Sequence, residues 1–397
     1  MTNTIYFHNI DRDNASSTST SSRSDFDNTE ILPTQEDIDN LQLEVLKEKI
    51  KVWNISMPIA LKSIKEQSFY FVAVNTLEKL LSFGDAFATS KRSPDKLFMV
   101  LDMYNTMCQL EQELQTILAG EAYHEIRELA LTLKKKLADI AHSTLDDFDQ
   151  AVENDATEID VLDGGVHPMT RYVINFLNLL LQYESTVKHL LEDFGMNDGT
   201  EYRMTLVTFR ILQALQTALG RKSGNYSDEA LYHLFLMNNV HHIVTFGRSK
   251  AKDLLGDEWV QIHQGLVQRH AYQYIRISLR KVLQAISVNG LHRPDSGILN
   301  IQVLKDRFKK FNMLFEDLYQ RNSQWTVPDS ELRESLRISL SVMLLPGYRS
   351  FLGRYSSEIK SEFISKGIVR YTVDDLDRML GEFFGEKERI DRNRHCF

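Results

Sequence analysis

Apolar residues recur with the spacing of α-helices over most of this chain. Intervals of three and four residues place side chains on one helical face, and such a face is formed by Leu97, Leu101, Tyr104 and Cys108. Residues 93–95, which precede it, read Ser-Pro-Asp. They supply an N-cap, a proline for the first helical position and an acidic first turn. The pattern therefore predicts a helix that begins near residue 94.

Further helices are predicted in the same way. One long helix is indicated by the apolar stripe Ile126, Leu129, Leu133, Leu137, Ile140 and Phe148. Residues 172–183 are apolar nearly all round, which is typical of a helix buried on several sides. The remaining predicted helices cover residues 202–219, 230–244, 257–287 and 332–340, and a last one is capped by Thr372. Pro346 and Gly347 predict a break or bend. The result is an all-α protein without a fixed repeat.

Composition supports this fold class. Among 397 residues there are 18 glycines and 7 prolines, few for a β-sandwich or a glycine-rich nucleotide fold. The first 35 residues include a polar Ser/Thr tract, which predicts a disordered tail. Residues 1–10 lack the pattern of a signal peptide, and the longest apolar stretch is too short to span a bilayer. With 2 cysteines as well, we expect an intracellular soluble protein.

The sequence offers no constellation typical of catalysis. Residues 163–168 read DGGVHP, which lacks the glycine spacing and the lysine of a phosphate-binding loop. His241 and His242 are adjacent and diverge on a helix, so they make a poor metal pair. His263 and His270 share a face but have no third ligand at helical spacing, which favours surface or capping roles. We therefore expect no enzyme activity, no cofactor and no metal.

Charge is distributed unevenly along the chain. The formal net charge is −9, which argues against a nucleic-acid binder. Residues 337–370 are the exception, because they carry six basic residues and two acidic ones. Such a surface can attract anionic lipid headgroups, since each Lys or Arg near them contributes about 1 kcal/mol. The other interpretation is a solvated surface whose charges pair with neighbouring acids at little net gain.

Several segments, in this order along the chain, are similar to those of one known family. They are RSPDKLFMVLDMY (92–104), GGVHPMTRYVINFL (164–177), LYHLFLMNNVHHIV (231–244), LLGDEWVQIHQ (254–264), QWTVPDSELRESLRISLSVMLLPGYRSFLGRY (324–355) and VRYTVDDLDRML (369–380). Together they resemble the seventy-kilodalton subunit of the exocyst (the exocyst complex component seven family) in its land-plant form. The resemblance covers about residues 45–385.

The resemblance implies an elongated rod of consecutive antiparallel helical bundles over residues 36–385, followed by a charged tail at 386–397. It implies a non-enzymatic subunit that tethers secretory vesicles to the plasma membrane during exocytosis. The implied partners are other exocyst subunits, phosphatidylinositol 4,5-bisphosphate and a Rho-type GTPase. The protein would be cytoplasmic and peripheral at the plasma membrane. The basic residues expected to contact the lipid are Arg349, Arg354, Lys360, Lys366 and Arg370.

Two departures from the family pattern leave a second interpretation open. Most of the N-terminal region of the family has no counterpart here, beyond a short helical start near residues 37–50. The family also tends to show Lys-aromatic-Ile-Lys-Tyr before its last helix. In this chain Gly367 replaces the first of these lysines and Arg370 the second, with Lys366 one position earlier. The alternative is a truncated, diverged paralogue that serves as a soluble protein-interaction platform in specialised trafficking or immunity, with weak or no lipid binding.

Overall fold

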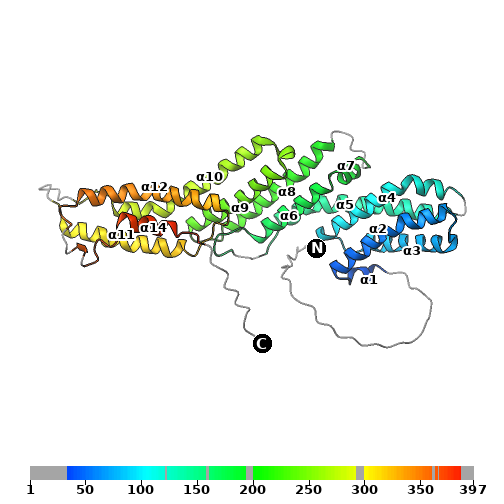
Figure 1. Cartoon of the computed structure of the whole chain (residues 1–397), viewed down its shortest axis with the longest axis horizontal. Helices are drawn as coiled ribbons and strands as arrows, with labels where there is room; N and C mark the ends of the chain where they lie inside the picture. Colours follow the sequence, from blue (N-terminus) through cyan, green and yellow to red (C-terminus); the bar gives the residue numbers. More distant parts are fainter. Residues whose placement is uncertain are drawn as a thin grey trace, which may run out of the picture. The chain divides into compact units, whose positions relative to one another are not determined.

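The structure, a computed structural model, describes residues 34–120, 123–157, 161–193, 200–291, 299–359, 363–364 and 366–385. Within these ranges every regular element is a helix and no β-strand is present (Figure 1). The predicted all-α fold is confirmed. No helix in the described part is long and apolar enough to cross a membrane. The two predicted tails fall almost wholly outside the described residues.

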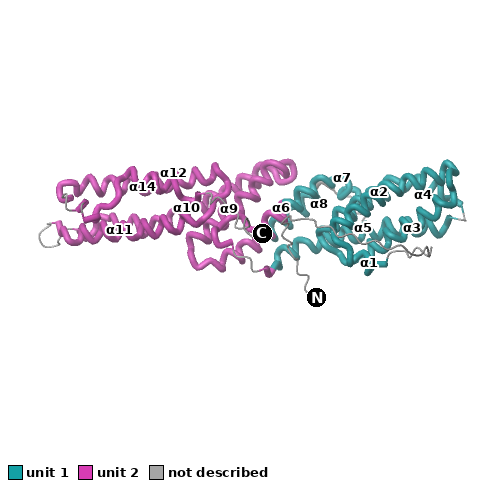
Figure 2. Tube along the Cα trace, turned by 60° about the horizontal axis from the view of Figure 1, so that its bottom comes forward, with its two compact units in different colours: residues 1–155, 175–214 teal, residues 156–174, 215–397 magenta. Residues whose placement is uncertain are grey.

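The helices divide into two compact units (Figure 2). Unit 1 comprises residues 1–155 and 175–214, and unit 2 comprises residues 156–174 and 215–397. Unit 1 contains α1 (Gln35–Asp39), α2 (Leu43–Lys65), α3 (Tyr70–Thr89), η1 (Pro94–Lys96), α4 (Leu97–Ile117), α5 (His124–Glu153) and α7 (Glu184–Asp193). Unit 2 contains α9 (Glu229–Ser249), α10 (Lys252–Ala285), α11 (Ile301–Asn322), α12 (Ser330–Arg354) and α14 (Val373–Gly381). Helices α6 (Pro168–Gln182) and α8 (Thr200–Ser223) contribute to both.

Unit 1 is a bundle in which α2 packs on α3 and α4, and α5 packs on the same two helices. The predicted start near residue 94 is confirmed, because Ser93 accepts a hydrogen bond from the Lys96 amide and Pro94 opens η1. Leu101 and Tyr104 of the predicted stripe are buried, as expected for the apolar face of an amphipathic helix. Trp53 adds a hydrogen bond between α2 and α3, since its indole N–H donates to the Leu80 carbonyl at 2.7 Å.

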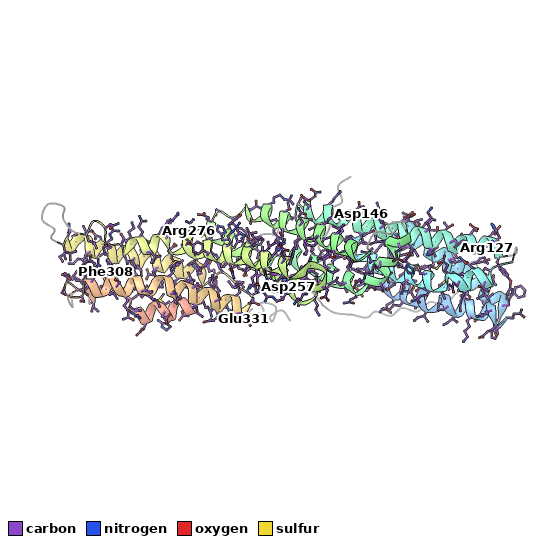
Figure 3. The ribbon with its side chains drawn as sticks, turned by 90° about the horizontal axis from the view of Figure 1, so that it is seen from above. Arg127, Asp146, Asp257, Arg276, Phe308 and Glu331 are labelled. Carbon is purple, nitrogen blue, oxygen red and sulfur yellow. The ribbon has the colours of Figure 1, made fainter. Side chains whose placement is uncertain are left out.

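Unit 2 is built around α9 and α10, and α10 also packs on α11 and α12. Aromatic rings join α11 to α12: Phe311 stacks on Tyr348 with ring centroids 4.5 Å apart, and Phe308 meets Phe351 edge-on. Phe308 near the start of α11 and Glu331 near the start of α12 lie at opposite ends of this pair (Figure 3). These two helices are therefore antiparallel, as the predicted bundle requires.

Of the break or bend expected at Pro346 and Gly347, the break is wrong, because α12 continues through both residues to Arg354. Proline lacks the N–H that would bond the carbonyl of residue 342 in a helix. Val342 is 69% exposed and Pro346 is also exposed, so water can bond that carbonyl instead. A proline on the solvent side of a long, well-packed helix is tolerated for this reason.

Two adjacent asparagines of α9, here called the asparagine clamp, hold the GGVHP turn in unit 2. The side-chain amide of Asn238 donates to the Gly164 carbonyl at 2.7 Å and to the Thr326 carbonyl at 2.8 Å. The amide of Asn239 donates to the Gly165 carbonyl at 3.2 Å. Gly164 has φ +71, and a Cβ there would lie 2.8 Å from a Leu231 methyl, so the turn requires glycine.

The same clamp fixes the start of α6. The Oδ1 atom of Asn239 accepts hydrogen bonds from the His167 amide at 2.9 Å and the Thr170 hydroxyl at 2.7 Å. The buried His167 ring in turn caps the helix, because its Nδ1 accepts from the Met169 amide at 3.1 Å. The GGVHP motif therefore has a structural role, in which buried side chains satisfy a buried backbone turn.

We expect Asn239→Ala to destabilise unit 2 by at least about 2 kcal/mol, because several buried polar groups lose their partner at once. Urea unfolding followed by circular dichroism measures this. Asn75→Ala is the matched control, since Asn75 is exposed on α3. Equal stability of the two variants would contradict the assigned role of the clamp.

Candidate functional site

The predicted lipid-binding residues do not all lie together. Arg349 and Arg354 are both exposed on the last turns of α12, and neither has an ion-pair partner among the described residues. Five residues apart on an α-helix, their side chains project in directions about 140° apart. The structure therefore does not bring these two guanidinium groups to one face. Lys360 lies outside the described residues.

Lys366 and Arg370 lie in the segment between α12 and α14, and this segment runs along one flank of α11. Three contacts define the alignment. The Lys305 ammonium lies 5.1 Å from the centroid of the Phe363 ring. The Asn312 amide donates to the Ile368 carbonyl at 3.1 Å, and the Tyr371 hydroxyl donates to Glu316 at 2.9 Å. The segment thus follows α11 in the same direction, with exposed Lys366 between the first two contacts.

The charge of Arg370 is compensated locally. Its guanidinium forms a hydrogen-bonded ion pair with Glu316 and lies 5.7 Å from the Tyr371 ring centroid. The Tyr371 hydroxyl bonds the same carboxylate, and burial together with this bond raises the pKa of Tyr371 to about 12. Arg370 therefore anchors the segment on α11, and an anion would compete with Glu316 for its charge.

Gly367 has a backbone conformation that favours glycine. Its φ is +64, in the left-handed region that side chains with a Cβ adopt at a cost. The amide of Gly367 bonds the Ile364 carbonyl at 3.0 Å, which closes a tight turn. The turn places Lys366 on its exposed side and buries Ile368.

The sequence prediction missed the lysines of α11. Lys305 and Lys309 are four residues apart and share the flank that faces residues 363–371, since Glu316 is seven residues beyond Lys309. Lys309 is exposed, and it has no ion-pair partner in the described part of the chain. We call Lys305, Lys309 and Lys366 the basic seam. Residues 305–310 read KDRFKK, and this local basic run could have pointed to the seam.

An apolar side chain accompanies the basic seam. Ile364 lies in the same segment and is 64% exposed, directly beside the buried Phe363 ring under Lys305. Arg307 is excluded from the seam, because its guanidinium donates to the Gln284 carbonyl at 3.2 Å and the Asn289 carbonyl at 2.9 Å. The seam therefore combines three lysines, of which Lys309 and Lys366 are exposed, with one exposed apolar group.

A second group of titratable residues lies between α9 and α10. The Nδ1 atoms of His233 and His270 are 2.9 Å apart, so one ring donates to the other. His270 was expected at the surface or in a cap and instead forms this pair, whereas His263 stacks on Trp259 with ring centroids 3.9 Å apart. No group of three or more His, Cys, Asp or Glu side chains in the described part could hold a metal.

Comparison with known proteins places the chain in a family. The family profile for the C-terminal region of the Exo70 exocyst complex subunit matches residues 55–382. The sequence is 47% identical over 388 residues to exocyst complex component EXO70A1 of Arabidopsis thaliana and 40% identical over 374 residues to component EXO70A3. The chain therefore belongs to the Exo70 family of exocyst subunits, as the sequence segments suggested.

The extent of these matches differs between this chain and its relatives. The alignments cover 91% and 88% of this chain but 61% and 63% of EXO70A1 and EXO70A3. The chain thus spans about three fifths of the length of these relatives. A solved structure of Saccharomyces cerevisiae Exo70 aligns with 88% of this chain and 73% of that chain, at 14% identity and a TM-score of 0.47.

The histidine pair predicts a pH-dependent stability. Burial, with His233 and Arg269 as further causes, lowers the pKa of His270 to about 4. Burial also lowers the pKa of His233; the nearby Glu229 carboxylate raises this pKa, and the Arg276 guanidinium lowers it further. In the unfolded chain histidine titrates near 6.5, so the unfolded state binds more protons between about pH 6.5 and pH 4. Stability should therefore fall as the pH falls through this window.

We expect His270→Gln to reduce that loss, so that its melting temperature drops less than that of the wild type between pH 7.5 and pH 4.5. Differential scanning calorimetry at both pH values measures the difference. His189→Gln on α7 is the control, because the His189 side chain is 66% exposed. The same pH dependence in all three proteins would contradict this account.

Proposed function

We propose that this chain is a non-enzymatic exocyst subunit that helps tether secretory vesicles to the plasma membrane during exocytosis. In this proposal it binds other exocyst subunits, a Rho-type GTPase and phosphatidylinositol 4,5-bisphosphate from the cytoplasmic side. Its membership of the Exo70 family supports the exocyst assignment, since its relatives are named as exocyst components. The basic seam supports the lipid assignment.

The observation that carries the lipid proposal is the alignment of residues 363–371 along α11. It brings Lys366 to the flank of α11 that bears Lys305 and Lys309, and it adds exposed Ile364. Phosphate groups on an inositol ring are bound by clustered cations, and each Lys or Arg near an anionic membrane contributes about 1 kcal/mol. An exposed apolar side chain beside them adds burial at the headgroup boundary.

Arg349 and Arg354 have a different part in this proposal. They project in different directions from α12, so one bound headgroup cannot engage both. We assign them to the general attraction of an anionic membrane, a long-range effect that salt screens within about 10 Å at 0.1 M. Arg370 contributes less than its charge suggests, because Glu316 is bonded to it.

The alternative function, a soluble interaction platform with weak or no lipid binding, is favoured by this compensation of Arg370 and by the divergence of Arg349 and Arg354. Co-purification distinguishes the tethering subunit from the soluble platform by the proteins that remain bound to the chain. A tagged full chain expressed in plant cells should retain other exocyst subunits if it is a tethering subunit. Their absence, with other proteins retained, would favour the platform.

We expect the full chain to co-sediment with vesicles that contain phosphatidylinositol 4,5-bisphosphate, more strongly at 50 mM than at 150 mM salt. Replacing Lys305, Lys309 and Lys366 by Ala should lower the vesicle partition coefficient by roughly a hundredfold, from about 1 kcal/mol for each lysine. The matched control replaces Lys49, Lys65 and Lys135, which are exposed in unit 1 and change the net charge equally. No sedimentation even at low salt would overturn the lipid assignment.

The ion pair predicts a variant that binds more strongly. Glu316→Gln removes the carboxylate that compensates Arg370 while it keeps a side chain of the same size. We expect vesicle binding to rise about fivefold, from one additional available cation. The double variant Glu316→Gln, Arg370→Ala should lose this gain. A gain that persists in the double variant would show that Arg370 is not its source.

A further inference from the structure

The outer face of α2 carries apolar side chains that nothing in the described structure covers. Val52 and Ile55 are each 62% exposed, Ile59 is 59% exposed and Val45 is 43% exposed. They lie at intervals of seven, three and four residues, the heptad spacing of a helix that packs along a second helix. Glu48 and Lys62 occupy the same series of positions. We call these six residues the α2 outer face.

This face is separate from the core of unit 1. The opposite side of α2 already contributes its buried residues, which include Leu46, Ile50, Trp53, Met57 and Leu61. The helix is therefore apolar on two sides, although one side suffices to hold it in the bundle. Scattered exposed apolar residues are normal on a protein surface, whereas a contiguous stripe marks an interaction site.

The two charges on this face indicate which partner fits it. Glu48 precedes Ile55 by seven residues and Lys62 follows it by seven. In an antiparallel pair of identical helices that cross at Ile55, Glu48 of each copy approaches Lys62 of the other, and Val52 approaches Ile59. A parallel pair would instead oppose like charges at both positions. We propose that two copies of this chain associate through the α2 outer face, antiparallel, about a two-fold axis at Ile55.

The charged side chains are free to make these contacts. Within one copy Glu48 bonds Lys51 at 2.6 Å, and Lys62 lies 3.9 Å from Glu66. All four side chains are more than half exposed, so these pairs are surface pairs of small net value. Exchange for partners in the second copy needs side-chain rotation alone. A two-fold interface is also the commonest arrangement of identical subunits.

The area of the α2 outer face determines the affinity that we expect for the dimer. Stable complexes bury about 800 Å² on each partner. Four partly exposed apolar side chains and two charged ones offer less than that, so the dimer is weak and forms at micromolar concentration. Sedimentation velocity of the full chain between 1 and 100 µM should therefore show a concentration-dependent shift from monomer to dimer. A monomer throughout this range would overturn the proposal.

Ile55→Asp tests the apolar part of the face. It places two carboxylates at the two-fold axis and should weaken dimerisation at least tenfold. Ile262→Asp is the matched control, because Ile262 is 56% exposed on α10, outside the proposed interface. Circular dichroism and thermal unfolding establish that both variants are folded. Equal dimerisation of a folded Ile55→Asp variant and the control would overturn the proposal.

A charge exchange tests the antiparallel arrangement. Glu48→Lys alone and Lys62→Glu alone each oppose like charges across the interface, and each should weaken the dimer several-fold at low salt. The double variant restores opposite charges and should recover the affinity of the wild type. Recovery supports the antiparallel pair. If the double variant instead loses as much dimer affinity as the two single variants lose together, the antiparallel arrangement is overturned.

Discussion

Unit 2 depends on hydrogen bonds that the asparagine clamp makes to a buried backbone turn. A buried carbonyl or amide without a partner destabilises a protein by about 1–3 kcal/mol, so the GGVHP turn can lie inside only if side chains reach it. Asn238 and Asn239 do so from one turn of α9. Because Asn238 also bonds the Thr326 carbonyl, the connection from α11 to α12 is held at the same place.

The α11–α12 hairpin in turn determines which charges can act together. Phe311 and Tyr348 fix the two helices against one another, and the Tyr348 hydroxyl holds the Tyr371 carbonyl at 2.8 Å. Residues 366–371, which precede α14, then lie along α11, where Arg370 forms an ion pair with Glu316. The same packing exposes Lys366 and compensates Arg370. Which cations face solvent is therefore a result of how the aromatic core positions the chain.

Much of the fold could be predicted because its signals are local. The cap at Thr372, for example, depends on Asp375 three residues away, and both hydrogen bonds of the capping box are present. The candidate site was predicted less well. A count of charges over residues 337–370 does not take into account the direction in which each side chain projects from a helix. Arg349 and Arg354 project in different directions for this reason. The nearness of Lys366 to α11 depends on contacts more than fifty residues apart in sequence, such as Asn312 to Ile368.

The contact between Thr326 and the GGVHP turn has a consequence for synthesis of the chain. The Thr326 amide bonds the Asp163 carbonyl at 2.8 Å, so unit 2 is incomplete until residue 326 has left the ribosome. Unit 1 also needs residues 175–214, which follow the first segment of unit 2. Interleaved segments of this kind delay long-range contacts and slow folding. During translation the backbone groups of the turn must therefore remain hydrated until their partners near residue 326 become available.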